Sequence, residues 1–568
     1  MKNLSITGLL LLLLVSCQPE SASTLSALDS IRINQLGYYP DAVKKFVVVG
    51  TEGEREYIVV NKATNEIVIE STLTASESWE LAGETVQVGD FSSLSEVGQY
   101  YIQVEGVGIS YDFNIKPNLY AEAFLGTLRA LYLQRSSTAI PEEFGGVYAR
   151  TMGHPDTVVN FHPSTGRTGQ TSSPKGWYDA GDYGKYVVNG AFPLGQLLTL
   201  YEQYPDRFAD GTSNIPESGN DFPDYLDELI HEMDWLLTMQ DEDGGLFHKL
   251  TTEAFEGMIM PGLAIRPRYI IGKGTAATLD FAAVAAKFSR IIVDVDPGYS
   301  HQCLAAAEKA WRWAMDNPVV NFKNPEDIAT GEYGDTDFSQ EFFWAAAELH
   351  LSTGRAVYAD YLETHWPLFD FKPGGSWANF MHFVGAFALA DYAKDDKSRT
   401  RAIQELTLAA DQILTNIEER PYRQPLNEFR WGSNSDIANA AMILAQAYRY
   451  TREVKYLQGV QESVDYIFGK NATGYSFVTG FGHKTPMHIH HRPSAADGIE
   501  APIPGLLSGG PNSGQQDKEF VTYPENVAPM QSWADEEPSY ASNEVCLNWN
   551  APLTYILGFL EFEQASLQ

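Results

Sequence analysis

The segment Asp224-Tyr-Leu-Asp-Glu-Leu-Ile-His-Glu-Met-Asp-Trp-Leu-Leu-Thr238 decides the fold class of most of the chain. Its apolar residues recur every three or four positions and therefore share one face of an α-helix. The same spacing returns between Ile437 and Tyr448. Outward from these segments, about twelve windows predict helices, near residues 118–134, 183–204, 223–240, 275–291, 300–316, 339–353, 355–363, 378–394, 398–415, 435–451, 453–469 and 549–565.

Short links that contain Gly, Pro or Asn join many of these windows, which favours antiparallel neighbours. Such helices would pair into hairpins, and a set of hairpins can close into a helical toroid. The stretch from Gly469 to Ser542 is helix-poor and rich in His, Gly, Pro and Asn. Loops this long inside compact domains are usually functional or disordered. We therefore expect this stretch to form the wall of an active site.

A different periodicity fills residues 31–116. Short apolar runs, β-branched or aromatic, alternate there with polar or Gly-containing links, which is typical of strands. The runs are Phe46–Val49, Tyr57–Val60, Ile67–Ile69, Tyr100–Ile102 and Tyr111–Ile115. The pattern predicts a small β-sandwich, followed by a helical domain over residues 117–568.

The N-terminus predicts export and a lipid anchor. Lys2 precedes the apolar run Ile6–Val15, which is too short to span a membrane. The end of the run, Leu14-Val-Ser-Cys17, resembles the bacterial lipobox, in which the cysteine is lipidated; an ordinary secretory signal with a chance cysteine is the alternative. We expect a signal peptide over 1–16, lipidation at Cys17 and a flexible tether over 17–30. The mature protein would be anchored by its lipid to the bacterial outer membrane, on the cell surface or the periplasmic face.

Composition excludes several classes of protein. The chain has 568 residues, 44% hydrophobic and 20% charged, which is typical of a folded body. Its 39 Lys and Arg against 74 Asp and Glu give a charge of −35, which repels a nucleic-acid backbone. Beyond Cys17 only Cys303 and Cys546 remain, too few for a disulfide framework. We expect a monomer that binds no nucleic acid and meets the membrane only through its lipid.

Two acidic segments could carry chemistry. In Trp177-Tyr-Asp-Ala-Gly-Asp-Tyr-Gly-Lys-Tyr186, Asp179 and Asp182 lie on either side of a glycine, just before a helical window. A turn there could aim both carboxylates at one point, and helix capping is an equal alternative. Glu544 lies where a loop meets an apolar helix, so desolvation would favour its protonated form and suit it to general acid catalysis. A glutamate that serves only the helix dipole is the alternative at that position.

Four of the chain's 12 histidines lie in the segment 483–491. Zinc binding is one interpretation, but the spacing His488-x-His490-His491 lacks a helical pair and a nearby cysteine. Together with Arg492, histidines in a Gly-rich loop are better explained as hydrogen-bond donors to neutral hydroxyl groups.

Taken together, these segments resemble glycoside hydrolase family 9, in the subgroup with an N-terminal immunoglobulin-like domain. The Asp-Ala-Gly-Asp motif at 179–182 matches, as do a histidine signature ending at His490 and Arg492 and an acidic signature that joins Asp535 to Glu544. The opening Ile31-Arg-Ile-Asn-Gln-Leu-Gly-Tyr38 is similar to the start of that immunoglobulin-like domain. The resemblance implies a mainly α fold, an (α/α)6 barrel preceded by a β-sandwich, that hydrolyses β-1,4-glucans with inversion.

The resemblance also implies a role for each motif residue. Asp182 would be the general base that activates water, Asp179 would help to hold that water, and Glu544 would be the general acid. Inversion requires acid and base about 6.5–9.5 Å apart with a water between them, which carboxylates from distant segments can frame. Four further residues would contact the sugar: His490, Arg492, Trp431 and Tyr540. Asp535 would support the site.

The resemblance implies no required cofactor, although some relatives bind metal ions. A structural calcium ion is expected, if one is present, at Asp335, Asp337 and Glu341, although Gln340 stands where an Asp would be usual. Cys546 stands where a small Ser, Thr or Ala is usual, which would change the packing behind the acid.

Some relatives bind zinc through cysteines and histidines in the loop before the Asp-Ala-Gly-Asp motif. Residues 151–163 contain no cysteine, which excludes a thiolate zinc site. His154, Asp156 and His162 are expected to shape one end of the cleft instead.

The expected substrate is a soluble β-glucan: a cellulose-like, mixed-linkage or xyloglucan backbone cleaved in the endo mode. An exo-acting β-glucosidase or oligosaccharidase of the same family is the main alternative. A non-catalytic glycan-binding lipoprotein would not need both Asp182 and Glu544. A polysaccharide lyase on a similar toroid would favour Tyr, His or Arg bases over two carboxylates.

Overall fold

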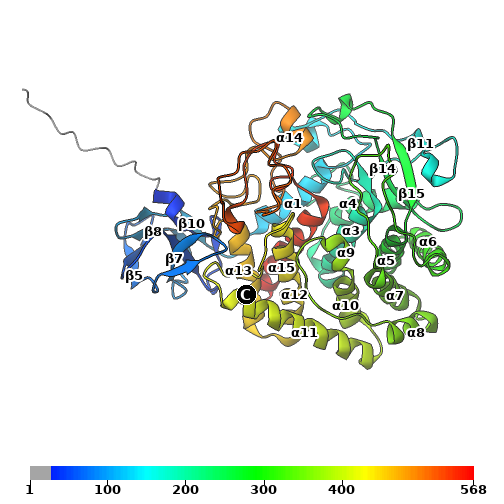
Figure 1. Cartoon of the computed structure of the whole chain (residues 1–568). Helices are drawn as coiled ribbons and strands as arrows, with labels where there is room; N and C mark the ends of the chain where they lie inside the picture. The colour runs from blue at the N-terminus through cyan, green and yellow to red at the C-terminus, as the bar shows by residue number, and fades with distance from the viewer. Residues whose placement is uncertain (1–26, 568) are drawn as a thin grey trace, which may run out of the picture.

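The computed structural model describes residues 27–567 and consists of a β-sandwich beside a larger helical barrel (Figure 1). The predicted signal peptide, the lipidation site Cys17 and most of the tether lie outside these residues. Within residues 27–567, no helix has the length and apolar character needed to cross a bilayer.

The sandwich consists of two sheets, with strand orders β1-β3-β7-β6 and β2-β10-β8-β4-β5; β9 pairs with β8. The strands are β1 Ile31–Arg32, β2 Gly37–Tyr38, β3 Lys45–Val49, β4 Glu56–Asn61, β5 Ile67–Thr72, β6 Glu77–Trp79, β7 Glu84–Asp90, β8 Gly98–Val104, β9 Gly108–Ile109 and β10 Phe113–Ile115. All five predicted strands are present. The sequence did not predict β1, β2, β6, β7 and β9. Four of these have only two or three residues, and in β7 buried Gln87 interrupts the apolar run; its amide donates to the carbonyls of Gly53 and Thr74.

Two polar side chains fasten the sandwich to the barrel. The Asn34 amide donates to the Asp465 carboxylate (2.8 Å). Gln35 Oε1 accepts the backbone N–H groups of His483 and Lys484 (2.8 Å each). Asn34 and Gln35 are both buried, so losing either partner would leave an unpaired polar group. The opening motif of the sandwich thus holds the histidine-containing loop in place.

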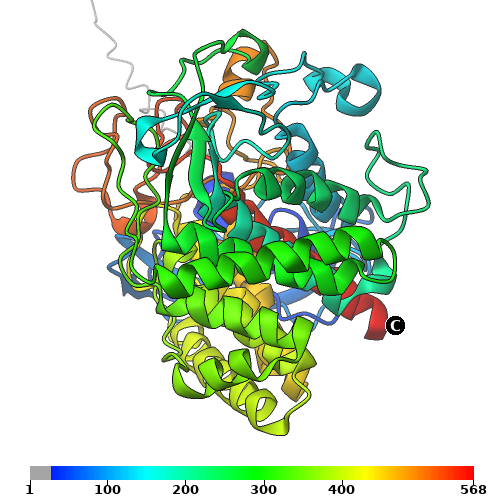
Figure 2. The same cartoon turned by 90° about the vertical axis from the view of Figure 1, so that its right-hand side faces the viewer.

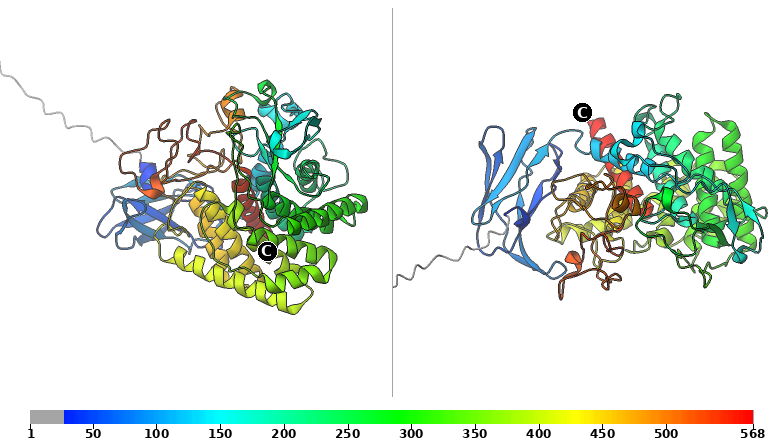
Figure 3. Two further views of the ribbon diagram at one scale, coloured as in Figure 1. Left: turned by 45° about the vertical axis from the view of Figure 1, so that its right-hand side comes forward. Right: turned by 90° about the horizontal axis from the view of Figure 1, so that it is seen from above.

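The long helices of the described chain alternate between an inner and an outer ring. The inner ring is α3 Val187–Gln203, α5 Thr275–Ile292, α7 Ser339–Thr353, α10 Met381–Tyr392, α12 Ser433–Thr451 and α15 Leu547–Leu567. The outer ring is α1 Ala121–Leu133, α4 Asp224–Thr238, α6 Pro297–Asp316, α8 Ala356–Thr364, α11 Asp396–Glu418 and α13 Val454–Ile467. Figure 2 shows the helices packed side by side, and Figure 3 shows the sandwich against one flank of the barrel. Each predicted helical window overlaps one of these helices, so the expected (α/α)6 architecture is confirmed.

Burial explains the composition of the two rings. The inner helix α5 is buried over nearly its whole length, and small residues such as Ala282 and Ala286 let neighbouring helices approach closely. The outer helix α11 instead buries one stripe of apolar residues, which includes Leu406 and Ile413, and leaves its polar residues nearer the surface.

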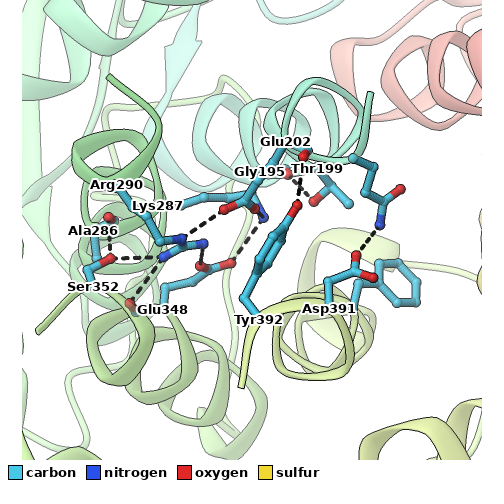
Figure 4. Close-up of polar contacts among 12 residues, drawn as sticks. Gly195, Thr199, Glu202, Ala286, Lys287, Arg290, Glu348, Ser352, Asp391 and Tyr392 are labelled. Atoms are coloured by element: carbon cyan, nitrogen blue, oxygen red, sulfur yellow. Dashed lines mark hydrogen bonds and ion pairs between the residues drawn. The ribbon is translucent and has the colours of Figure 1, made fainter. Parts of the chain in front are cut away.

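The C-terminal ends of four inner helices meet in a buried polar network (Figure 4). Arg290 of α5 donates to Glu202 of α3 and to Glu348 of α7 (2.8 Å each). Lys287 lies between the same two carboxylates (3.0 and 3.4 Å). Tyr392 of α10 donates to the Glu202 carbonyl (2.6 Å). Removing one partner would strand a buried charge, so the network fixes how these helices meet at this end.

A small sheet absent from the prediction covers the other end of the barrel. Its order is β12-β11-β15-β14-β13. The strands are β11 Val159–Phe161, β12 Gln170–Thr171, β13 Lys185–Tyr186, β14 Phe247–Thr251 and β15 Tyr269–Lys273. Runs this short carry little periodicity, so the sequence did not reveal them. Because β13 begins three residues after Asp182 and pairs with β14, the sheet anchors the turn that carries the aspartates.

Three short helices complete the set of α-helices in the described chain: α2 Glu142–Gly145, α9 Ser376–Asn379 and α14 Arg492–Ala496. Between Gly469 and Ser542 the only helical segments are α14 and a 3-10 turn at Pro529–Gln531. This stretch is therefore helix-poor, as predicted.

Candidate active site

A cleft of about 790 Å³ lies at the end of the barrel where inner helices begin. Residues at or just before the start of α3, α7, α12 and α15 line it. Seven of the predicted site residues are in its wall: Asp179, Asp182, Trp431, His490, Arg492, Tyr540 and Glu544. The long helix-poor stretch supplies three of these, so it does form part of the wall.

Backbone pairing brings three distant segments together. Ala180 forms an antiparallel bridge with Cys546, and His490 forms a parallel bridge with Glu544. The His490 N–H also donates to the Asn543 carbonyl (3.0 Å). The segment with Glu544 therefore lies between the aspartate turn and the histidine loop.

Only a glycine fits at position 181, because the three segments pack too closely there for a side chain. A Cβ at this position would lie 2.0 Å from the His490 carbonyl oxygen and 3.3 Å from Glu544 Oε1. The backbone N–H and the guanidinium of Arg492 both donate to the Gly181 carbonyl (3.1 and 2.8 Å). The glycine of the Asp-Ala-Gly-Asp motif thus permits close approach between the aspartate turn and Glu544.

Asp179 is buried and held on both sides. Its Oδ1 accepts from the Asn189 amide and its Oδ2 from the Tyr333 hydroxyl (2.7 Å each). Burial raises the pKa of Asp179 well above its usual value, and the negative charge of Asp182 raises it further. Two neighbouring carboxylates resist ionising together, so the two aspartates act as one coupled unit.

Asp182 lines the cleft and engages the protein mainly through one oxygen. Its Oδ2 accepts the Gly184 N–H (2.9 Å) and the Tyr186 hydroxyl (3.2 Å). The capping alternative is wrong, because the N-cap of α3 is Tyr186 and no side chain caps that helix end. Held in this way, Asp182 can accept a proton from a water molecule in the cleft.

Glu544 lies just before α15, with only part of its surface reaching the cleft. Burial raises the pKa of Glu544 well above its usual value, and the charge of Asp182 raises it further, whereas Arg492 opposes the shift. A carboxyl group in this setting keeps its proton to a higher pH than an exposed glutamate does, and can donate it. Glu544 contacts Gly181 and forms a backbone bridge with His490, so it does more than interact with the dipole of α15.

His490 and Arg492 present polar atoms to the cleft. His490 Nδ1 donates to the Glu537 carbonyl (2.8 Å), so Nε2 of the neutral ring is an acceptor and not the predicted donor. Burial lowers the pKa of His490, so the ring is neutral at pH 7. Arg492 Nε donates to the Glu256 carbonyl (2.8 Å), which with its bond to Gly181 fixes the guanidinium.

The remaining histidines of this loop have other surroundings. His491 is buried and bonded to Gln134 Oε1 (3.0 Å). His483 stacks on Tyr111 of the sandwich, with ring centroids 5.2 Å apart. His488 is exposed. Across residues 27–567, no three His, Cys, Asp or Glu side chains are arranged to hold a metal ion, so the zinc interpretation has no support there.

Asp535 lies behind the cleft wall. Its carboxylate accepts the backbone N–H groups of Met487 (3.0 Å) and His488 (2.8 Å) and the Asn543 amide (3.2 Å). Because Asn543 directly precedes Glu544, Asp535 ties the histidine loop to the segment of the acid. The structure places Asp535 between these two segments, and its supporting role in catalysis stays a prediction.

Trp431 and Tyr540 provide the aromatic surface of the cleft at one side. Their ring centroids lie 5.5 Å apart, and Trp431 is 39% exposed. The Tyr540 hydroxyl donates to the Gln516 carbonyl (2.7 Å), which fixes the ring. Exposed aromatic faces of this kind suit the apolar faces of pyranose rings.

His154, Asp156 and His162 do not line the cleft, so their predicted place at one end of it is wrong. Asp156 is buried and pairs with Lys185 and Arg268 (2.9 Å each). His154 Nδ1 and the Tyr178 hydroxyl share a hydrogen bond (2.9 Å). His162 lies beside Asp327 on another loop. The sequence placed these residues near the motif but could not show that the chain passes behind it.

A buried carboxylate cluster lies between α5 and α7. Both oxygens of Asp280 and of Glu341 and one oxygen of Asp335 are buried without a hydrogen-bond partner in the described chain. The charges of Asp280 and Asp335 add to burial in raising the pKa of Glu341. Asp337 is exposed, and its Oδ1 accepts the Ser339 N–H (3.1 Å). The structure thus joins Asp335 and Glu341 as predicted, adds Asp280, and places Asp337 outside the cluster.

Sequence reasoning missed several residues of the cleft. Tyr333 and Asn189 position Asp179, and Asn189 also donates to Cys546 Sγ (3.1 Å). Asp436, buried at the start of α12, accepts the Gly374 N–H (2.7 Å), and burial raises its pKa to about 8. The one usable signal was position: each lies at or near the N-terminal end of an inner helix, as the motif residues do.

Comparisons with known proteins agree with this geometry. The model of glycosyl hydrolase family 9 matches residues 120–557, and that of the cellulase N-terminal Ig-like domain matches residues 27–109. The xyloglucan-specific endo-β-1,4-glucanase BoGH9A of Bacteroides ovatus is 40% identical over 99% of this chain and 98% of its own length. Endoglucanase D of Acetivibrio thermocellus is 33% identical over 94% of this chain and 81% of its own length.

Solved structures give the same result. A Bacteroides ovatus family 9 structure superposes with a TM-score of 0.86 and 39% identity, covering 94% of this chain and 99% of the other. The structure of AaCel9A in complex with cellobiose-like isofagomine has a TM-score of 0.86 and 29% identity, with 94% and 100% covered. The matched family model spans the barrel and therefore includes the paired aspartates and Glu544, the acid whose pKa is raised. The chain belongs to glycosyl hydrolase family 9.

Proposed function

We propose that the protein is an inverting endo-β-1,4-glucanase that acts on soluble β-glucans. One observation carries the proposal: Glu544, an acid whose pKa is raised, shares a cleft with the coupled pair Asp179 and Asp182. A proton donor and a proton acceptor from distant segments are what inversion needs. The curated relatives named above, all endoglucanases, support the endo mode.

In the proposed mechanism Glu544 protonates the glycosidic oxygen as the bond to the anomeric carbon breaks. Asp182 removes a proton from a water molecule that attacks the same carbon from the opposite face. Asp179, held by Asn189 and Tyr333, helps to fix that water, while Gly184 and Tyr186 keep Asp182 oriented. The attack from the opposite face turns a β-linkage into an α-product.

Neighbouring groups would position the sugar on either side of the broken bond. Nε2 of neutral His490 can accept a hydrogen bond from a sugar hydroxyl, and the fixed guanidinium of Arg492 can donate one to a hydroxyl group. Trp431 and Tyr540 offer aromatic faces to the pyranose rings. Most of the cleft wall is uncharged, which suits a neutral polysaccharide.

Product analysis over time on soluble glucans tests this function. We expect carboxymethylcellulose, mixed-linkage glucan or xyloglucan to lose viscosity early and to give a broad range of oligosaccharides. One short product from the first minutes, without loss of viscosity, would identify the exo-acting alternative. No hydrolysis of any of the three polymers would overturn the proposed activity.

A structural calcium ion would be held by Asp280, Asp335 and Glu341. Their unpaired, buried oxygens fit the all-oxygen ligand set that Ca²⁺ prefers. The ion would neutralise like charges that otherwise repel one another inside the protein. No three acidic groups in residues 27–567 already converge on one point, so binding would draw the carboxylates together.

Calcium should therefore raise the melting temperature of the wild-type protein relative to EGTA, and Glu341→Gln should abolish that increase. The exposed Asp337→Asn serves as the matched control and should keep the full calcium effect. An unchanged melting temperature in calcium and EGTA would contradict the site. Loss of the effect in Asp337→Asn would place the ion at the originally predicted ligands.

We further propose that Cys17 is lipidated and holds the enzyme at the outer membrane. The support is the sequence Leu14-Val-Ser-Cys17 after a short apolar run. Cys17→Ser should move the processed protein from the membrane fraction to the soluble fraction without changing its hydrolytic rate. A serine variant that still sediments with membranes would contradict the anchor.

A further inference from the structure

Lys249, in the centre of β14, is a fully buried cation close to the aspartate turn. Its ammonium group donates to Asn324 Oδ1 (2.6 Å), to the Gly331 carbonyl (2.7 Å) and to the hydroxyl and carbonyl oxygens of Thr330 (3.2 and 3.4 Å). These acceptors lie on the loop between α6 and α7 and are all uncharged. A buried charge whose contact partners are neutral is costly. Because a neutral donor could hold the same oxygens, the positive charge itself calls for a use.

The strand and the loop that Lys249 joins carry the two tyrosines that hold the catalytic aspartates. Lys249 lies opposite Tyr186 in the pairing of β13 with β14, and its Nζ lies 5.5 Å from the centre of the Tyr186 ring. The Tyr186 hydroxyl donates to Asp182 (3.2 Å). The loop held by Lys249 continues into Tyr333, whose hydroxyl donates to Asp179 (2.7 Å). Lys249 is therefore connected to each aspartate through one tyrosine.

Electrostatic attraction links Lys249 to the same two aspartates. Burial lowers the pKa of Lys249 to about 7. The negative charges of Asp182, Glu332 and Asp179 oppose that shift. The attraction is mutual, so a charged Lys249 stabilises the ionised carboxylates in return. Since Asp179 and Asp182 repel each other, a neighbouring cation favours the ionised state that a general base requires.

Other titratable groups face the aspartate pair from other elements: Glu544 and Cys546 before α15, Glu232 of α4, and His490 and Arg492 of the histidine loop. The cation among them is Arg492, whose charge opposes the rise in the pKa of Glu544 and so acts on the acid. His248, next to Lys249, is neutral, because burial and the charge of Lys249 lower its pKa to about 3. Lys249 thus supplies the positive charge on the β14 side of the aspartates.

We propose that Lys249 is a positioning residue of the hydrolytic centre, whose positive charge keeps the aspartate pair ionised at mildly acidic pH and whose hydrogen bonds hold the loop that carries Tyr333. The proposal rests on the proposed function, because it concerns the same aspartate pair. Lys249 is not part of the cleft lining, so it acts through other residues and does not touch the substrate. The two aspartates titrate as a coupled unit, and the acidic limb of kcat/KM against pH reports on that unit.

Two substitutions separate the charge of Lys249 from its hydrogen bonds. Lys249→Met removes both, whereas Lys249→Gln removes the charge and keeps N–H donors for the loop oxygens. In both variants the acidic limb of kcat/KM on a soluble β-glucan should move to higher pH by about one pH unit, because the base then holds its proton more tightly. Above that limb, Lys249→Gln should retain more activity than Lys249→Met. The glutamine variant decides the test by itself if the methionine variant does not fold.

Lys323→Met is the matched control, since Lys323 is an exposed lysine of the same loop and its replacement removes the same charge. Solvent and salt screen an exposed charge, so its acidic limb should coincide with that of the wild type. Acidic limbs equal to wild type in the Lys249 variants would overturn the proposal, even if their rates were lower. A shift in Lys249→Met that is absent in Lys249→Gln would also overturn it, because the hydrogen bonds alone would then account for the effect.

An equal shift in Lys323→Met would overturn the proposal as well, because any nearby positive charge would then serve. A wild-type protein that is inactive on every β-glucan would instead refute the proposed function. An active wild type whose acidic limb does not respond to Lys249 would refute only the role of Lys249, so the two failures are distinct.

Discussion

Replacing Glu544 by Gln should lower kcat on a glucan polymer by about 10²–10⁴-fold, the contribution typical of a positioned general acid. Glutamine keeps the shape of the side chain and removes the proton that the leaving oxygen needs. The loss should be much smaller on a dinitrophenyl β-cellobioside, because its leaving group departs without protonation. Steady-state kinetics on both substrates measure the difference.

Glu536→Gln is the matched control, since Glu536 is an exposed glutamate of the same loop, and it should behave as wild type. The pH profile supplies a second readout. Because the pKa of Glu544 is raised, wild-type activity should persist above the usual range of a glutamate and fall as pH rises through that raised pKa. Glu544→Gln should lose this alkaline limb. A polymer rate near wild type would remove Glu544 from the role of acid.

Asp182→Ala should cause a loss of similar size, about 10²–10⁴-fold, because water would attack without a base. Sodium azide should restore turnover of a dinitrophenyl β-cellobioside. The azide ion needs no deprotonation, fits the space left by the carboxylate, and bonds to the anomeric carbon as the phenolate leaves. The expected product is the α-glycosyl azide, which mass spectrometry and NMR identify.

Asp179→Asn tests the division of labour within the pair. Asp179 has both oxygens engaged by Asn189 and Tyr333, so it positions water and does not accept its proton. The variant should be impaired and azide should not rescue it. Rescue of Asp179→Asn but not of Asp182→Ala would exchange the two roles.

The sequence predicted the helical barrel well because the apolar periodicity of a helix extends over many residues. Spacing such as that of α4 repeats through several turns, and even the fully buried α5 remains long and rich in helix-forming residues. The short strands β11 to β15 have two to five residues, too few for any periodicity to be distinguished. Their positions depend on tertiary packing over the barrel end.

Site residues could be predicted where they form a motif of neighbouring residues in the sequence. They could not be predicted where only folding brings them together. Asp179, Asp182 and Glu544 stand in recognisable motifs, and the structure places all three in one cleft. Asp280 is a single acid within an apolar helix, and only folding brings it to Glu341.

The anomeric form of the first product tests the central claim most directly. Proton NMR during the first minutes of hydrolysis of a soluble β-1,4-glucan records the new reducing ends before mutarotation mixes them. If Asp182 activates water opposite a bond protonated by Glu544, the α-anomer appears first and the β-anomer follows at the rate of spontaneous mutarotation. A β-anomer at the earliest times would mean retention through a covalent intermediate and would contradict the account.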